Sequence, residues 1–147
     1  MNNFIAYIAP TAQKVCRKYN LPCSVCIAQA ILESGWGKHC IGNYNYWGRK
    51  YGGWGKSATK VTKEHLRGKW VTITAKFQSY DSLEQAVNDW CRLIKETPRY
   101  RSVIKTWHAP WILSDFVKAL AKVYATDPKY ADKVMSVIKK NNLMNYD

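Results

Sequence analysis

Acidic residues are scarce in this chain of 147 residues: Asp and Glu together number ten against 23 Lys and Arg, which gives a formal net charge of +13. Such an excess indicates an anionic partner, either a nucleic acid, a membrane surface or an anionic cell-wall surface. The basic residues are scattered and their densest groups are short, which disfavours a nucleic-acid-binding arm. A basic surface that serves only solubility is the alternative reading of the same charge.

Long apolar runs are also missing. No run approaches the roughly 20 residues needed to cross a bilayer, so we expect no membrane insertion. The first eight residues have no basic residue ahead of their apolar ones, and Pro10 and Gln13 soon interrupt the apolar pattern. We therefore expect no signal peptide and synthesis in the cytoplasm, with release by a separate protein if the chain acts outside. The length and a hydrophobic content of 47% predict one globular domain, 1–147, which we expect to be a monomer.

The cysteines number five, an odd count that cannot pair completely within the chain, so a disulfide framework is not expected. Cys23 and Cys26 have the CxxC spacing of zinc sites, and Cys40 follows them. A single CxxC is a weak signal, however, and Cys26 falls among the apolar positions of an expected helix, where a free thiol packs as a small hydrophobe. We therefore expect reduced structural thiols, no metal and no cofactor.

Apolar residues recur with helical spacing over most of the chain and predict five helices. The predicted helices cover residues 5–19, 25–34, 83–94, 116–123 and 127–138. Ser24 is expected to cap the second helix, and the first helix is expected to kink or restart at Pro10. Ser82 and Gln85 have the spacing of a capping box, and Asp127 before Pro128 predicts the start of the last helix.

The remaining segments predict a loop and one β-hairpin. Residues 35–55 are rich in glycine and aromatic residues, which is typical of an irregular loop. Residues 60–66 and 70–77 form two strand-like segments around Arg67 and Gly68, and the second alternates apolar and polar residues. The fold class is therefore α+β, mainly helical with a small β-hairpin lobe. A groove between the two lobes is the expected consequence.

Glu33 is the acid whose preceding neighbours are almost all apolar, and it stands just before Gly35 at the predicted helix end. Apolar surroundings and the negative end of the helix dipole both disfavour the charged carboxylate, so we expect a raised pKa. A raised pKa suits a general acid at the edge of a groove, as hydrolysis of a glycosidic bond requires.

A second carboxyl is Glu64, late in the first hairpin strand. Lys60, Lys63 and Arg67 surround it in sequence and would keep it ionised, as a base or an electrostatic partner would be. The alternative is an exposed carboxylate that neutralises basic neighbours. Aromatic rings in the glycine-rich loop are candidates for stacking on sugar faces, and we expect sugar contact by at least one of Trp36, Tyr46, Trp47 and Trp54.

Four motifs resemble the endo-β-N-acetylglucosaminidases of glycoside hydrolase family 73, which include autolysins, flagellar peptidoglycan hydrolases and phage lysins. They are Ile27 to Gly37, Asn45-Tyr46-Trp47-Gly48, Lys76 to Tyr80 followed by Ser82, and Tyr124 to Ala131. The resemblance implies a lysozyme-like α+β fold and cleavage of the β-1,4 bond after N-acetylglucosamine in peptidoglycan glycan strands.

The same resemblance implies roles for individual residues. Glu33 takes the position of the general acid, Glu64 resembles the proposed second acid, and Tyr124 is similar to an active-site tyrosine. The candidate substrate-binding residues are Trp36, Asn45, Tyr46, Trp47 and Tyr130. Relatives often have Asn-Leu-Phe-Gly where this chain has Asn-Tyr-Trp-Gly, so the sugar contacts are expected to differ. A compact chain without wall-binding repeats suits a phage endolysin.

Two other functions stay open at this point. A lytic transglycosylase can share the fold and needs one acid only, and it leaves an anhydro sugar. A non-catalytic wall-binding module could keep the same groove. The hairpin carboxylate and the Tyr-Ala-Thr-Asp-Pro segment favour hydrolysis.

Overall fold

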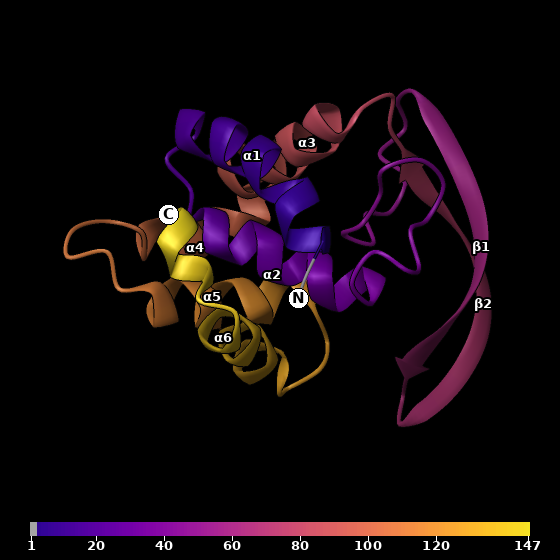
Figure 1. Ribbon diagram of the computed structural model, residues 1–147. Coiled ribbons are helices and arrows are strands. Elements are labelled where there is room, and N and C mark those ends of the chain that lie inside the picture. The colour runs from indigo at the N-terminus through magenta and orange to yellow at the C-terminus, as the bar shows by residue number, and fades with distance from the viewer. Residues whose placement is uncertain (1–2) are drawn as a thin grey trace.

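The computed structural model describes residues 3–147 and has a helical part and a separate β-hairpin (Figure 1). The α-helices are α1 (Asn3–Lys18), α2 (Cys23–Ser34), α3 (Leu83–Glu96), α4 (Arg101–Lys105), α5 (Leu113–Tyr124) and α6 (Tyr130–Lys140). The strands are β1 (Lys56–Leu66) and β2 (Lys69–Ser79), and the short 3-10 helices are η1 (Pro98–Tyr100) and η2 (Leu143–Tyr146). The predicted α+β class is confirmed.

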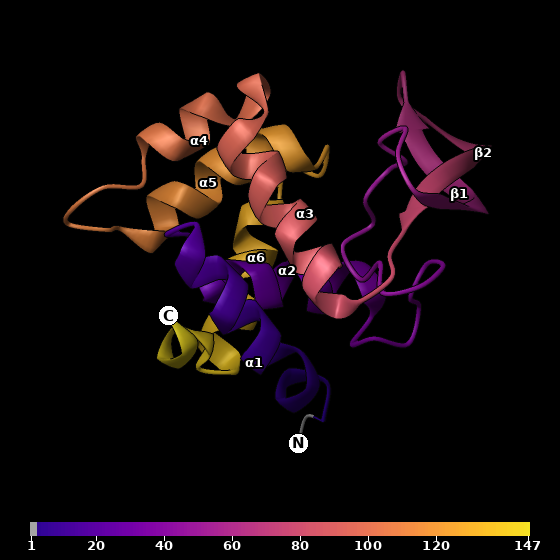
Figure 2. The same ribbon diagram turned by 90° about the horizontal axis from the view of Figure 1, so that it is seen from above.

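Helix α2 forms the centre of the helical part. All of its residues are buried except Leu32 and Glu33, at its C-terminal end. Helices α1 and α6 and η2 pack around it, and Figure 2 shows the hairpin standing apart from the helices with the 35–55 loop between them. A helix that is apolar on nearly every side belongs in a core, so burial of α2 follows directly from its sequence. The C-terminal end of α2 leaves the core and places Glu33 at the boundary between the helices and the hairpin.

The start of α2 differs from the prediction. The helix begins at Cys23, and Ser24 lies inside it rather than at its N-cap. Instead, the Asp147 carboxylate accepts hydrogen bonds from the backbone N–H and the hydroxyl of Ser24, both at 2.6 Å. A carboxylate at this end satisfies free N–H groups and complements the helix dipole. Helix α1 continues through Pro10 without interruption.

The other two predicted helix starts have different outcomes. The Ser82 hydroxyl accepts the Gln85 N–H at 3.1 Å, as a capping residue does, while the Gln85 side chain binds the Asp81 N–H at 2.8 Å. Helix α6 begins at Tyr130 and not at Asp127. The Asp127 carboxylate instead accepts the Lys129 N–H at 2.8 Å in the preceding turn, which is the competing local bond that Asp side chains form in turns.

The hairpin is longer than the sequence predicts, because pairing extends back to Lys56 opposite Ser79. Arg67 and Gly68 form the two-residue turn, both with positive φ (51° and 75°), as a type I′ turn requires. Residues alternate between two faces: Lys60, Thr62 and Glu64 share the face toward the helices. Lys63 therefore belongs to the opposite face.

The five cysteines are all free thiols. Cys16, Cys23, Cys26 and Cys91 are buried and unpaired, and the sulfurs of Cys16 and Cys91 lie 3.9 Å apart. Within residues 3–147, no cluster of side chains is arranged to hold a metal ion and no helix is long and apolar enough to span a membrane. The expectation of no signal peptide rests partly on Met1 and Asn2, which lie outside the described residues.

Candidate active site

A groove of about 630 Å³ lies between the C-terminal end of α2, the hairpin and the connection from α5 to α6. Its size is that of a ligand site. Among the residues that line it are four of the predicted site residues: Glu33, Glu64, Tyr124 and Tyr130. The groove expected between the lobes is therefore present, and it brings together residues from four separate parts of the chain.

The backbone around Glu33 places its carboxyl at the groove wall. Gly35 ends α2 with φ 56°, in the left-handed conformation that glycine adopts without strain, and its N–H binds the carbonyl of Ile31. Across the groove, Gly48 has φ 67°, and a Cβ added there would lie 3.3 Å from Glu33 Oε1. A side chain at position 48 would therefore crowd the carboxyl.

A chain of hydrogen bonds holds Glu33 from the core side. The Tyr130 hydroxyl donates to Glu33 Oε2 at 2.9 Å and accepts from Gln29 Nε2 at 3.0 Å. Gln29 Oε1 in turn accepts from the indole N–H of Trp90 at 2.6 Å. Because an indole nitrogen can only donate, Trp90 fixes the orientation of the Gln29 amide, and the direction of every bond in the chain follows.

These surroundings set the protonation of both groups. Removal of the Glu33 carboxyl from water in the groove raises its pKa, and the hydrogen bond from Tyr130 partly opposes this by stabilising the anion. This is the direction the sequence predicts. Burial raises the pKa of Tyr130 far above its usual value, and the nearby charge of Glu33 adds to the effect. Tyr130 therefore keeps its proton and remains a donor.

Tyr124 lies beside Tyr130 with the two rings stacked, 6.2 Å between centroids and 7° between planes. Its hydroxyl donates to the backbone carbonyl of Trp47 at 2.7 Å, which ties the end of α5 to the 35–55 loop. Burial raises the pKa of Tyr124 well above its usual value, and the charge of the nearby Glu33 carboxylate adds to this. Tyr124 is therefore a neutral phenol in the wall of the groove.

Glu64 reaches the groove from β1, but its partner differs from the prediction. It pairs with Lys50, Nζ to Oε1 at 3.1 Å, and not with the lysines and arginine near it in sequence. Lys60 lines the groove on the same strand face, whereas Lys63 belongs to the other face. Strand alternation explains the difference, because only every second residue of β1 can share a face with Glu64.

Two predicted substrate-binding residues are buried in the structure. Asn45 is 1% exposed and its amide is used internally: Nδ2 donates to the carbonyls of Arg49 and Gln78, and Oδ1 accepts from the Arg49 N–H. Trp47 is also 1% exposed, and its indole N–H donates to the carbonyl of Cys26. These side chains hold the loop against α2 and β2, and the sugar contacts predicted for them stay predictions.

Two further candidates lie outside the groove lining. Tyr46 packs edge-on against Phe4 at 5.3 Å and Tyr7 at 6.0 Å, so it joins the loop to α1. Trp36 is partly buried, with φ 63° just after α2. Their predicted sugar contacts stay predictions.

Sequence reasoning missed several residues that build the site. Lys50, Lys60, Thr62 and Asp127 line the groove, and Gln29 orients its acid through Tyr130. A signal existed for two of them: Lys60 and Thr62 precede Glu64 by four and two residues on one strand. Gln29 also had a signal, because it is an uncharged polar residue inside a helix whose neighbours are apolar, and such a residue must find a buried partner.

Comparison with known proteins finds a matching family model and similar relatives. A family model described as "Mannosyl-glycoprotein endo-beta-N-acetylglucosaminidase" matches residues 9–143. Peptidoglycan hydrolase FlgJ of Pseudomonas aeruginosa is 35% identical over 148 residues, which cover 95% of this chain and 36% of that protein. A "Probable N-acetylmuramidase" of Lactococcus lactis subsp. cremoris is 38% identical over 153 residues, which cover 98% of this chain and 34% of that protein. The chain thus spans about a third of the length of these curated relatives.

The same likeness extends to solved structures. The catalytic domain of the autolysin Auto from Listeria monocytogenes matches with a TM-score of 0.81 and 37% identity, covering 98% of this chain and 85% of that domain. A likeness over nearly the whole chain confirms the lysozyme-like α+β fold.

Proposed function

Because the chain belongs to the mannosyl-glycoprotein endo-β-N-acetylglucosaminidase family, we propose that it hydrolyses the β-1,4 bond after N-acetylglucosamine in the glycan strands of peptidoglycan. The observation that carries the proposal is the Glu33 carboxyl. Its pKa is raised, Tyr130 holds it, and it shares one groove with a second carboxyl from the other lobe. Glycoside hydrolysis needs such a pair.

Glu33 serves as the general acid. While it is protonated, its Oε2 accepts the hydrogen bond from Tyr130, so the acidic proton resides on Oε1. Oε1 is the oxygen beside Gly48, where the loop has no side chain to block it. After the proton passes to the leaving oxygen, the Tyr130 bond strengthens on the new carboxylate. Tyr130 therefore stabilises the charge that develops on the acid.

Glu64 serves as the base or as an electrostatic partner of the developing positive charge. Its ion pair with Lys50, with Nζ 3.1 Å from Oε1, holds the Glu64 carboxyl within the groove lining. The hairpin carries it on a lobe separate from that of Glu33, so the distance between the two carboxyls depends on how the lobes are placed. That distance decides between inversion and retention.

The names of the relatives do not agree on which glycosidic bond is cut, so the choice of bond belongs to the proposal. The family description refers to a glucosaminidase, whereas one relative is named an N-acetylmuramidase. The two activities cut opposite bonds of the same strand, so each leaves a different reducing sugar. Residues 1–147 act in this proposal as one catalytic domain and as a monomer at an anionic wall surface, without nucleic acid or membrane insertion.

Mass spectrometry of fragments released from purified peptidoglycan, after borohydride reduction, tests the proposal. Reduced N-acetylglucosamine ends are expected from the native protein, with a loss of about 10²–10⁴-fold in Glu33→Gln. Glu84→Gln is the matched control, because Glu84 is exposed on α3 and forms its ion pair with Lys14 on α1. Reduced muramic ends would reassign the bond, anhydro-muramyl ends would show a transglycosylase, and intact walls would leave a binding module.

A further inference from the structure

A second cavity, of about 500 Å³, lies along α3, and neither Glu33 nor Glu64 is among the residues that line it. One side is a stripe of polar α3 residues, Gln85, Asn88, Asp89, Arg92 and Glu96, and Trp54 of the 35–55 loop lines it as well. Consecutive residues of the 35–55 loop line the two sites, because Gly48 lines the catalytic groove and Arg49 lines this cavity. From this cavity we infer a further saccharide-binding site, which holds N-acetylated amino sugars of a glycan strand.

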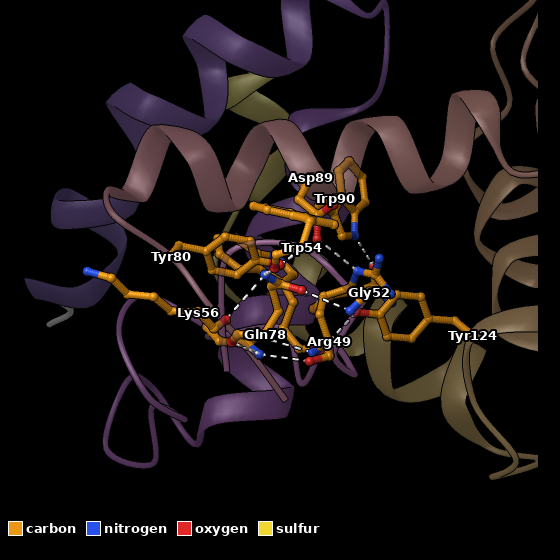
Figure 3. Close-up of polar contacts among 12 residues, drawn as sticks. Arg49, Gly52, Trp54, Lys56, Gln78, Tyr80, Asp89, Trp90 and Tyr124 are labelled. Carbon is orange, nitrogen blue, oxygen red and sulfur yellow. Dashed lines mark hydrogen bonds and ion pairs between the residues drawn. The ribbon is translucent and has the colours of Figure 1, made fainter. Parts of the chain in front are cut away.

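Trp54 is held in place from behind although it is 41% exposed. Its carbonyl accepts a hydrogen bond from Gln78 Nε2 at 2.7 Å, and Gln78 Oε1 binds the Gly52 N–H at 2.9 Å (Figure 3). Gln78 itself is 1% exposed. The Trp54 ring also contacts Tyr80, with 6.0 Å between centroids. A buried side chain thus fixes the loop that presents an exposed indole to the cavity, and such a ring is a platform for a sugar face.

Tyr80 connects this platform to α3. Its hydroxyl donates to Asp89 Oδ2 at 2.5 Å, and Arg49 Nε lies 3.3 Å from the same oxygen (Figure 3). Both contacts use Oδ2, so Asp89 Oδ1 accepts no hydrogen bond from residues 3–147. The Trp54 ring and the Asp89 carboxylate are therefore fixed relative to each other by Tyr80, whose side chain is buried.

The cavity wall carries further polar atoms without a hydrogen-bond partner among residues 3–147. They include donors and acceptors: the Nη atoms of Arg92, Nδ2 of Asn88, Oδ1 of Asp89 and Oε2 of Glu96. Sugar hydroxyl and acetamido groups need both kinds of partner beside an apolar ring.

The charges of the wall favour a neutral ligand. Two arginines, Arg49 and Arg92, are balanced by two carboxylates, Asp89 and Glu96, and each arginine lies close to one of them. A phosphate-rich polymer would gain little from such a wall, although the chain as a whole is strongly basic. The assignment of the sugar as an N-acetylated one rests on the proposed function.

Binding of N-acetylglucosamine tetramer to Glu33→Gln, followed by NMR of the ¹⁵N-labelled indole groups, tests this inference. The Trp54 indole signal should move saturably, and Trp54→Ala in the same background should weaken tetramer binding about threefold to tenfold. Trp70→Ala, on the exposed hairpin tip, is the matched control and should bind normally. If Trp54→Ala does not fold, Arg92→Gln decides, with an expected loss of about twofold to threefold.

Each outcome separates this inference from the proposed function. A Trp54 signal that stays still at saturating tetramer, or equal affinity in Trp54→Ala, overturns the α3 site even if the native protein cuts peptidoglycan. A saturable Trp54 shift in a protein whose native form leaves peptidoglycan intact supports the site and rejects the proposed activity.

Discussion

Replacement of Tyr130 by phenylalanine tests how the structure controls its acid. The change removes one hydroxyl group and with it the hydrogen bond to Glu33 Oε2 at 2.9 Å. It also leaves Gln29 Nε2 without an acceptor, while Trp90 still holds the other end of the amide. One substitution thus has one effect on catalysis and a separate effect on stability.

The catalytic effect has a sign and a size. The hydrogen bond lowers the pKa of Glu33 against the effect of burial, so without it the pKa rises further and the acid stays protonated to higher pH. The limb on which kcat falls with rising pH should therefore move upward. A hydrogen bond to a charged group contributes about 1.5–3 kcal/mol, so loss of this one from the newly formed carboxylate should lower the maximal kcat about tenfold to hundredfold.

The stability effect comes from Gln29. A buried amide donor that loses its partner costs about 1–3 kcal/mol, which should appear in the free energy of unfolding by urea. The matched control is Tyr100→Phe, since Tyr100 is 3% exposed and its hydroxyl makes no hydrogen bond with residues 3–147. It should change neither the pH limb nor kcat.

The assay is the initial rate of reducing-end release from solubilised peptidoglycan, measured across the pH range at saturating substrate. An unmoved limb, or one that moves to lower pH, would refute the role given to Tyr130. An equal loss of kcat in Tyr100→Phe would show that any missing phenol hydroxyl in this region has the same effect.

Three further predictions concern the site and its support. Because burial raises the pKa of Glu33, its ionisation costs folding energy as pH rises above the ordinary carboxyl range, so Glu33→Gln should raise Tm relative to the native protein at neutral pH and not at acid pH. Gly48→Ala should cost about 1–2 kcal/mol in urea unfolding and lower kcat, whereas Gly68→Ala, also at positive φ but with open space around it, should cost stability alone. Ser24→Ala should lose about 1 kcal/mol of stability with unchanged kinetics, because the Asp147 carboxylate keeps only the backbone N–H.

Local pattern was enough to place the acid. Glu33 ends a helix that is apolar on nearly every side, and a glycine stops the chain there, so its position at a lobe boundary with a raised pKa follows from neighbours within ten residues. The hairpin followed for the same reason, since the type I′ turn at Arg67 and Gly68 lies within the segment that it joins. What depends on nearby residues could be predicted.

Motif resemblance was a poorer guide to exposure. Asn45 and Trp47 stand within a family motif, which indicates importance but not which surface they face. Their side chains turned out to secure the loop internally. The exposed ring of the same loop is Trp54, and its exposure depends on Gln78, more than twenty residues later in the chain.

The orientation of Glu33 shows why the rest was out of reach. Its hydrogen-bond chain runs from Trp90 on α3 to Gln29 on α2 and Tyr130 on α6, so three helices must pack before the acid has a fixed direction. The sequence contains one sign of this arrangement, which is the single glutamine, Gln29, among the apolar neighbours of α2. A buried amide needs a donor for its oxygen and an acceptor for its nitrogen. Because an indole N–H can only donate, the amide oxygen must face it and the amide nitrogen must face the other partner. The orientation of the Glu33 carboxyl thus follows from the donor and acceptor properties of the residues in this chain of hydrogen bonds. Which residues meet in that chain is decided by the packing of the three helices.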